Sequence, residues 1–268
     1  MDTGAFAATA KGAHVKLERF GSAAKDVALA AFFALTALLA HAGPPFRTDD
    51  PEAVEYKHAE VYVFGQETLT ADGRSGVLPA LEFNYGIYPK VQLHLVAPWA
   101  FDHPSQGSSA RGYGDTELGV KWQLNEETEG TPMIGVFPLV EVPTGNSDKG
   151  LGNGHSQIFL PVWLQKKWGK LQTYGGGGYW INSGADNRNN WFVGWQAQYE
   201  FSERLTLGAE VFHTTRQKID QGSSTGFNIG GYYNFDEHNH FLFSGGKGLH
   251  NASETNRFSA YIGYQYTF

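Results

Sequence analysis

The chain has 268 residues and no cysteine, and its 27 Asp and Glu against 20 Lys and Arg give a net charge of −7. The absence of cysteine excludes disulfides and thiolate metal sites, and the acidic balance lacks the basic footprint that nucleic-acid binding needs. Aromatic residues make up 15% of the chain, with 34 glycines, yet the mean hydropathy is −0.36. This balance is typical of a barrel in lipid, which combines an apolar outer face and aromatic girdles with a polar lumen.

Residues 1–42 have the features of an export signal. Four Lys and Arg residues precede an apolar run over 27–40, which is shorter than the roughly 20 residues that a spanning helix needs. Ala40 and Ala42 are small residues at the positions that a signal peptidase reads. A buried core helix is the alternative, and the flanking charges disfavour it. We predict a signal peptide that is cleaved before Gly43, which leaves a mature chain with 24 acidic and 16 basic residues.

The next segment, residues 43–58, contains three prolines and no periodic pattern. We expect an extended periplasmic segment. It can fold into the mouth of a barrel, but it is too short to form a large plug.

From residue 59 to the end, apolar and polar residues alternate with a period of two in segments of about ten residues, the pattern of transmembrane β-strands. In the clearest segment, 115–124, Leu118, Val120 and Trp122 share one face. The sequence predicts one antiparallel β-barrel over residues 59–268, in the bacterial outer membrane. Its predicted strands number about 12: 59–69, 77–87, 91–99, 115–124, 133–142, 156–165, 171–180, 191–201, 205–214, 225–235, 240–248 and 258–268.

The links between these segments alternate in length, as do the periplasmic turns and external loops of membrane barrels. The links at 88–90, 166–170, 201–204 and 236–239 are short, and the intervening ones are longer and rich in Gly, Ser, Asn and Asp. Two links depart from this alternation: 125–131 is longer than the other periplasmic turns, and 70–76 is short for an external loop. An even number of strands puts both ends of the barrel chain in the periplasm.

The last strand ends on the aromatic Phe268, a feature that the barrel-assembly machinery of the outer membrane recognises. We therefore expect that machinery, outer-membrane lipid and lipopolysaccharide as partners, with no nucleic acid. The alternative is a secreted β-sandwich or propeller, which would expose unusually apolar rows to water.

If the apolar rows face lipid, the polar rows face the lumen. Acids outnumber bases there, and buried carboxylates must be paired, hydrated or protonated. One interpretation is a salt-bridged core that closes a structural barrel, and the other is a hydrated pore with a weak cation preference. Glu117 and Lys121 are the strongest candidates and are expected to lie close enough for a salt bridge. The predicted lumen residues are Glu60, Glu82, His94, Glu117, Lys121, Glu141, Glu200, Glu210 and Lys247.

No motif predicts a catalytic, cofactor or metal site. The cluster 236–240 has two histidines, but it lies in a predicted turn where no hydrogen-bond partners that would orient them for a metal can be inferred. Residues 150–154 are glycine-rich like a phosphate loop, but no helix follows them. His155 and Ser156 point to opposite faces of a strand, so they do not form a base–nucleophile pair.

Three stretches together resemble a family of outer-membrane transporters associated with the meta-cleavage pathway of phenol degradation. They are 43–51 with 58–61, 112–115 running into 117–122, and 234–235 with 238–248. The resemblance implies a membrane barrel that moves small hydrophobic or aromatic compounds, and no catalytic residue is carried over. We therefore predict an outer-membrane channel or transporter for small solutes rather than an enzyme. A lipid-modifying hydrolase of the outer membrane and a closed structural barrel are the alternatives.

Overall fold

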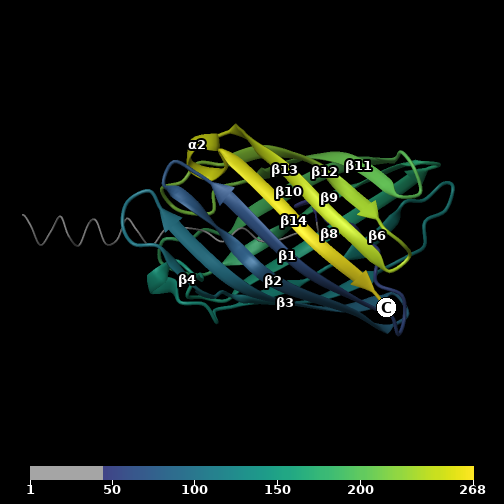
Figure 1. The fold of residues 1–268 in the computed structure, drawn as a ribbon, viewed down its shortest axis with the longest axis horizontal. Coiled ribbons are helices and arrows are strands. Elements are labelled where there is room, and N and C mark those ends of the chain that lie inside the picture. The colour runs from purple at the N-terminus through teal and green to yellow at the C-terminus, as the bar shows by residue number, and fades with distance from the viewer. Residues whose placement is uncertain (1–44) are drawn as a thin grey trace, which may run out of the picture. The chain divides into compact units, whose positions relative to one another are not determined.

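The computed structural model describes residues 45–268, which form one antiparallel sheet closed into a barrel (Figure 1). The predicted signal peptide lies outside the described residues. No helix between residues 45 and 268 is long and apolar enough to cross a membrane. The helical elements of this part are η1 Ser147–Lys149 and α2 Ala252–Thr255. The strands are β1 Ala59–Leu69, β2 Gly73–Tyr88, β3 Val91–Pro104, β4 Ala110–Tyr113, β5 Thr116–Gln123, β6 Met133–Val136, β7 Leu139–Val142, β8 Gln157–Trp168, β9 Leu171–Asn182, β10 Asn190–Glu200, β11 Leu205–Thr214, β12 Ser224–Asn234, β13 Asn239–His250 and β14 Phe258–Thr267.

These 14 segments make 12 barrel strands because two pairs of them follow each other along a single path. β4 and β5 both pair with β3, and β6 and β7 both pair with β8. The second path is interrupted at Phe137 and Pro138, and a proline has no N–H to donate to a neighbouring strand. The single antiparallel barrel of about 12 strands is thus confirmed.

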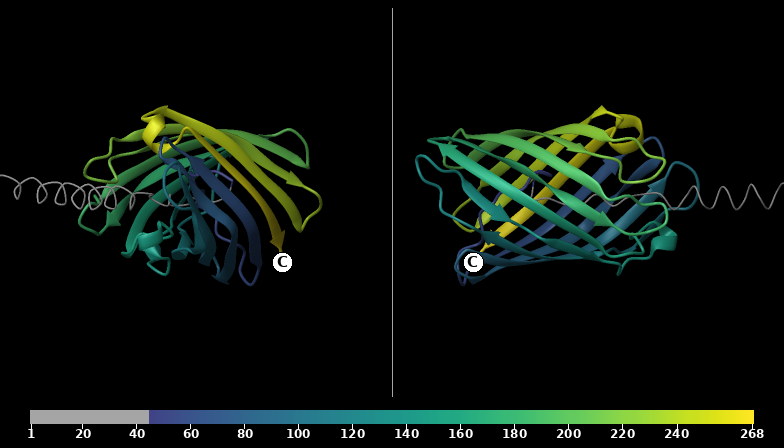
Figure 2. Two further views of the ribbon diagram at one scale, coloured as in Figure 1. Left: turned by 60° about the vertical axis from the view of Figure 1, so that its left-hand side comes forward. Right: turned by 180° about the vertical axis from the view of Figure 1, so that it is seen from behind.

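The barrel closes where β1 pairs with β14, from Glu60 opposite Thr267 to Leu69 opposite Phe258. Every barrel strand therefore has two neighbours, and the sheet has no free edge. This matters in lipid, where an unpaired backbone group finds no water to bond with. The strong tilt of the strands is visible from all sides (Figure 2).

The two ends of the barrel differ in the length of their connections. At one end β8 meets β9 through Gly169 and Lys170, and Gly169 supplies the left-handed conformation (φ 58°) that a two-residue hairpin turn favours. The C-terminus lies at this end, which we call the short-turn end (Figure 1). The other end, the long-loop end, carries η1, α2 and the links 183–189 and 215–223.

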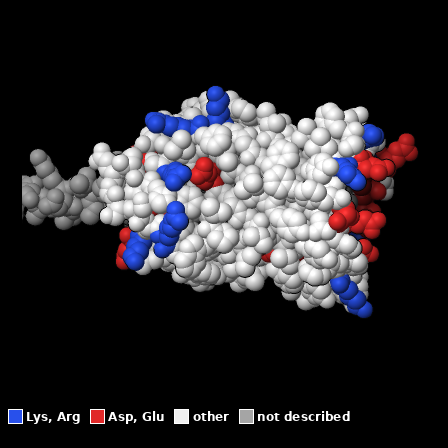
Figure 3. Space-filling model, in the orientation of Figure 1, with Lys and Arg blue, Asp and Glu red and all other residues white. Residues whose placement is uncertain are grey.

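Exposure alternates along each strand, with the apolar row outside. On β10, Trp191 and Trp195 are 54% and 56% exposed, whereas Gln196, which points into the barrel, is fully buried. This is the reverse of a water-soluble protein and fits an outer face solvated by lipid. On the face shown in Figure 3, charged side chains gather toward the two ends of the barrel.

Candidate channel lumen

The N-terminal segment, residues 45–58, enters the barrel. Thr48 is fully buried and Asp49 is 2% exposed, although neither belongs to a strand. A β-carbon on Gly194 would lie 2.2 Å from the Thr48 hydroxyl, so the glycine makes room for the segment. Residues 43–58 are expected to form an extended periplasmic segment that can fold into the mouth; residues 45–58 instead reach from the short-turn end into the lumen, with Thr48 and Asp49 buried there.

Glu210 on β11 binds the segment through its carboxylate. Its oxygens accept hydrogen bonds from the backbone N–H of Arg47 (2.9 Å), the N–H of Thr48 (2.8 Å) and the Thr48 hydroxyl (2.7 Å). The Asn228 amide donates a further bond at 2.6 Å. Four donors thus satisfy one buried carboxylate, and charge-assisted bonds of this kind are stronger than neutral ones.

Lys121 on β5 binds the same segment on another side of the lumen. Its ammonium lies 3.0 Å from the Asp49 carboxylate and 3.6 Å from that of Asp50. It also lies 5.0 Å from the centre of the Phe137 ring, within the range of a cation–π contact. Because Lys121 and Asp49 are both buried, each needs the other as its counter-charge.

A hydrogen-bonded network surrounds His94 on β3. Its Nδ1 lies 2.7 Å from Asn84 Oδ1, and its Nε2 lies 2.8 Å from Glu117 Oε1. The Asn84 amide donates to Glu82 at 2.8 Å, which fixes the amide oxygen toward the imidazole. Both ring nitrogens therefore lie within hydrogen-bond distance of wall oxygens, which fixes the imidazole between β2 and β5.

A cavity of about 370 Å³ separates the segment from this part of the wall. Carboxylates of both line it, with Asp49 and Asp50 on the segment and Glu60, Glu82 and Glu117 on the strands. The cavity is large enough for several water molecules. An acidic space large enough for water therefore lies within the barrel, next to the buried part of the segment.

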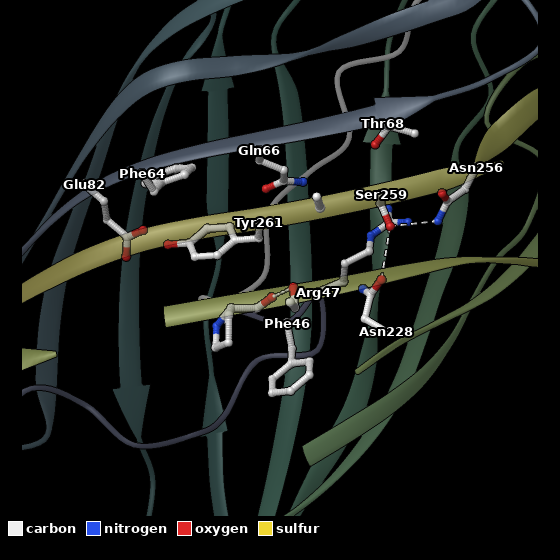
Figure 4. A pocket seen from close by; sticks show the side chains of 13 residues that line it. Phe46, Arg47, Phe64, Gln66, Thr68, Glu82, Asn228, Asn256, Ser259 and Tyr261 are labelled. Carbon is white, nitrogen blue, oxygen red and sulfur yellow. Dashed lines mark hydrogen bonds between the residues drawn. The ribbon is translucent and has the colours of Figure 1, made fainter. Parts of the chain in front are cut away.

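A second, smaller space of about 30 Å³ lies between Phe46 and Arg47 of the segment and the wall formed by β1, β12 and β14 (Figure 4). Ser259 links Asn228 and Asn256 through two hydrogen bonds of 3.1 Å on its wall. This space has about the volume that one water molecule occupies in the liquid. The segment therefore packs closely against this side of the lumen.

Aromatic rings line the opposite side of the lumen, from β8 to β11. Phe159 stacks on Trp180 with ring centres 4.5 Å apart, and Phe192 stacks on Phe212 at 6.4 Å. A β-carbon on Gly178 would lie 2.6 Å from the Phe159 ring, so the glycine run of β9 accommodates these rings. We call this set the aromatic wall: Phe159, Trp163, Trp180, Phe192 and Phe212, all buried.

The alternation of apolar and polar residues does not predict the aromatic wall, because it assigns apolar rows to lipid and β8 has apolar residues on both faces. The polar ends of the inner row, Gln157 and Gln165, were the signal that Phe159 and Trp163 between them point inward.

The structure places most of the predicted lumen residues on inner rows. Glu200 is half-buried near the short-turn end, and Glu141 faces Glu117 across β5 and β7 while accepting a 2.9 Å hydrogen bond from Asn153. The residues on inner rows are Glu60, Glu82, His94, Glu117, Lys121, Glu141, Glu200 and Glu210.

Lys247 is the exception, and its prediction as a lumen residue was wrong. It is exposed and pairs with Phe227 on β12, whose neighbour Asn228 points inward. Directly paired residues share a face of the sheet, so Lys247 lies on the outer face. Leu242 and Ser244 mark the inner row of β13, and Lys247 is out of phase with them.

The expected salt bridge between Glu117 and Lys121 is also absent from the ion pairs of residues 45–268. Glu117 bonds to His94, and Lys121 turns to the two aspartates of the segment. The partner of Lys121 comes from the segment inside the lumen, which no pattern in the strands predicts.

The loop motifs have structural roles. Asp115 accepts backbone hydrogen bonds from Gly145 (2.9 Å) and Asn153 (2.6 Å), which ties the glycine-rich loop to the wall. In the turn after β12, Asp236 caps the N–H groups of His238 and Asn239, and the bond from His238 lowers the pKa of the Asp236 carboxyl. No cluster of three metal-ligating side chains occurs among the described residues.

Comparison with known proteins decides the family. Residues 60–268 match the family model described as "Putative MetA-pathway of phenol degradation". The chain belongs to this family. The resemblance inferred from the short motifs is thereby confirmed, and no curated protein matches the chain by sequence.

Solved structures with the same fold are membrane barrels. An outer membrane channel from Pseudomonas putida F1 is 18% identical, with a TM-score of 0.69 over 82% of this chain and 98% of that one. The KdgM porin, solved with disordered oligogalacturonate, is 11% identical (TM-score 0.54, 77% and 99% covered). The NanC porin is 9% identical (TM-score 0.53, 77% and 98% covered). The fold is thus that of outer-membrane channels and porins.

Proposed function

We propose that the chain is a channel of the bacterial outer membrane for small hydrophobic or aromatic solutes, and that its N-terminal segment holds it closed at rest. In this proposal residues 1–42 are removed on export, and the short-turn end faces the periplasm. The observation that carries the proposal is the docking of residues 45–51 inside a barrel of the channel fold, on Glu210 and Lys121.

The chemistry of the lumen supports the solute class. A plane of stacked rings offers an aromatic solute the offset and edge-to-face contacts that aromatic pairs favour. The acidic cavity around Glu82 and Glu117 supplies water and hydrogen-bond acceptors on the other side of the bore. A solute with a ring and one polar group can contact the aromatic wall with its ring and the acidic cavity with its polar group.

The segment supports closure at rest. Its residues Thr48 and Asp49 are buried inside the barrel, where Asp49 pairs with Lys121 and the backbone of Arg47 bonds to Glu210. A pore must then open by displacing the segment, which makes opening an infrequent event. The same observation favours a closed structural barrel if the segment never leaves.

A disulfide tether separates these two functions. The chain has no cysteine, and a β-carbon on Gly194 would lie 3.2 Å from that of Thr48, close to the roughly 3.8 Å of a disulfide. We expect Thr48→Cys/Gly194→Cys to be silent in planar bilayers when oxidised and to show discrete current steps when reduced. Thr48→Cys alone is the control, and its current should not depend on the redox state. If wild-type and reduced protein are both silent although folded, the barrel is structural.

The solute class is tested by current block. Benzyl alcohol should interrupt the open current in a concentration-dependent way, and arabinose should not. Trp180→Leu removes one ring of the aromatic wall and should weaken the block without removing the current. Equal block by both solutes, or an unchanged block in Trp180→Leu, would refute an aromatic solute.

A further inference from the structure

The outer face carries basic side chains in a row at the long-loop end. Arg74 on β2 is paired with His103 on β3, and His103 Nε2 lies 3.4 Å from the Arg111 guanidinium on β4. Arg74 also faces Leu69 on β1, which is 41% exposed on the outer surface. Because paired residues share a face, these side chains project outward together.

The row continues across the closing strands. Leu69 pairs with Phe258, next to the exposed Arg257. Gly246 on β13 pairs with Ser259 on β14, so Lys247 follows beside Phe258 in the same outward row. We call the set formed by Arg74, His103, Arg111, Lys247 and Arg257 the basic row.

The basic row lies at the edge of the apolar band. Leu69 and Phe258, which lie between its charges, are 41% and 46% exposed. Arg74 on β2 and Lys247 on β13 are three strands apart, and at about 4.8 Å per strand this is a distance of about 14 Å. On this face basic groups gather at the long-loop end, with one acidic group among them and further acidic atoms at the lower left edge (Figure 3). The acid that contacts the row is Glu67, whose carboxylate lies 3.9 Å from Arg74.

This arrangement suits an anionic lipid better than water. Long basic side chains at a membrane surface keep their charge in the headgroup layer while their stems cover apolar surface. Guanidinium groups bind phosphate with two parallel hydrogen bonds. Arg74 makes a loose 3.9 Å contact with one carboxylate, Arg111 lies 3.4 Å from His103 and Arg257 donates one 3.0 Å bond to Ser253, so each guanidinium keeps further N–H donors for a phosphate.

We propose that the basic row binds the phosphate groups of lipopolysaccharide in the outer leaflet. The inference rests on the outer-membrane location and on the outward orientation of the long-loop end, but not on conduction. The spread of charges over three strand spacings suits a headgroup that carries two phosphates, and the exposed Leu69 and Phe258 lie where its acyl chains begin.

Binding of lipid A to the folded protein in detergent, measured by native mass spectrometry, tests the proposal. The variant Arg74→Gln/Lys247→Gln/Arg257→Gln should bind bisphosphorylated lipid A about a hundredfold more weakly, since each basic residue near an anionic surface contributes about 1 kcal/mol. The matched control, Lys167→Gln/Lys170→Gln/Arg204→Gln, removes the same charge from exposed positions near the short-turn end and should bind normally.

Two further comparisons make the test specific. Glu67→Gln removes the acid beside Arg74 and should tighten binding, an effect that misfolding cannot produce. Dephosphorylated lipid A should bind wild-type protein as weakly as it binds the triple variant. Equal affinity of wild type and triple variant, or equal binding of phosphatidylglycerol and lipid A, would overturn the proposal. Heat-modifiable gel migration verifies that each variant is folded, and conductance reports separately on the channel.

Discussion

Replacement of Lys121 by Met should release the N-terminal segment from the lumen. Met keeps much of the side-chain length but leaves the Asp49 carboxylate, 2% exposed, without its partner at 3.0 Å. Removal of one member of a buried ion pair costs about 3–5 kcal/mol, because an uncompensated charge remains behind. The docked state alone contains this pair, so the cost falls on docking.

At 1.4 kcal/mol per factor of ten, that cost lowers the ratio of docked to undocked segment by about a hundredfold to a few thousandfold. We expect the open probability of single channels to rise in proportion while the conductance of each step stays similar. Lys170→Met, which changes an exposed lysine in a turn, is the control and should behave as wild type.

The double variant Lys121→Met/Asp49→Leu tests the reasoning. Replacement of both charges by apolar groups leaves no unpaired charge, so it should restore much of the docking that the single variant loses. The reasoning is refuted if Lys121→Met leaves the open probability unchanged, or if the double variant opens more than the single one.

Three further changes probe the bonds between Glu210 and the segment, the outer face of the barrel and a loop. Glu210→Gln weakens the charge-assisted bonds to Thr48, each worth about 1.5–3 kcal/mol, so amide exchange at Thr48 should accelerate at least tenfold in mass-spectrometric measurements. Val162→Arg places a charge on the lipid face of β8 and should lower the unfolding free energy in vesicles by about 2–4 kcal/mol, measured by urea titration. Burial lowers the pKa of Lys218, in the loop before β12, to about 8, so the folded state takes up fewer protons than the unfolded state between pH 8 and 10.5. Its titration, followed by NMR of methylated lysines, should have a midpoint near pH 8, and stability should rise with pH from there to 10.5.

The strands could be predicted because lipid imposes a simple rule on them. A strand with lipid on one side and a polar lumen on the other must alternate, as Trp195 and Gln196 do on β10. Short turns at one end then fix where strands begin and end. The same rule fails for Lys247, because its charge favours the lumen whereas the aromatic residues of β13, which share its row, face outward.

The contents of the lumen were harder to predict because no periodicity describes them. The segment that reaches Glu210 has no repeat, and its contacts with the wall join residues about 160 positions apart in the sequence. The aromatic wall could not be predicted for a related reason. Phe159 on the inner row of β8 and Leu160 on the outer row are both apolar, so alternation of polarity cannot assign either one.

The order of charges along the segment explains why it docks in one register. Arg47 and the N–H groups of residues 47 and 48 face Glu210, and the Arg47 guanidinium lies 4.4 Å from the centre of the Phe212 ring. Two residues on, Asp49 faces Lys121. A shift of the segment by one residue would bring Asp49 away from its ammonium partner and Thr48 away from Glu210. Two anchors, the N–H and hydroxyl donors that meet Glu210 on β11 and the carboxylate that meets Lys121 on β5, therefore select a single docked position. Release of either anchor alone leaves the other to guide the segment back, which suits a gate that opens and closes again.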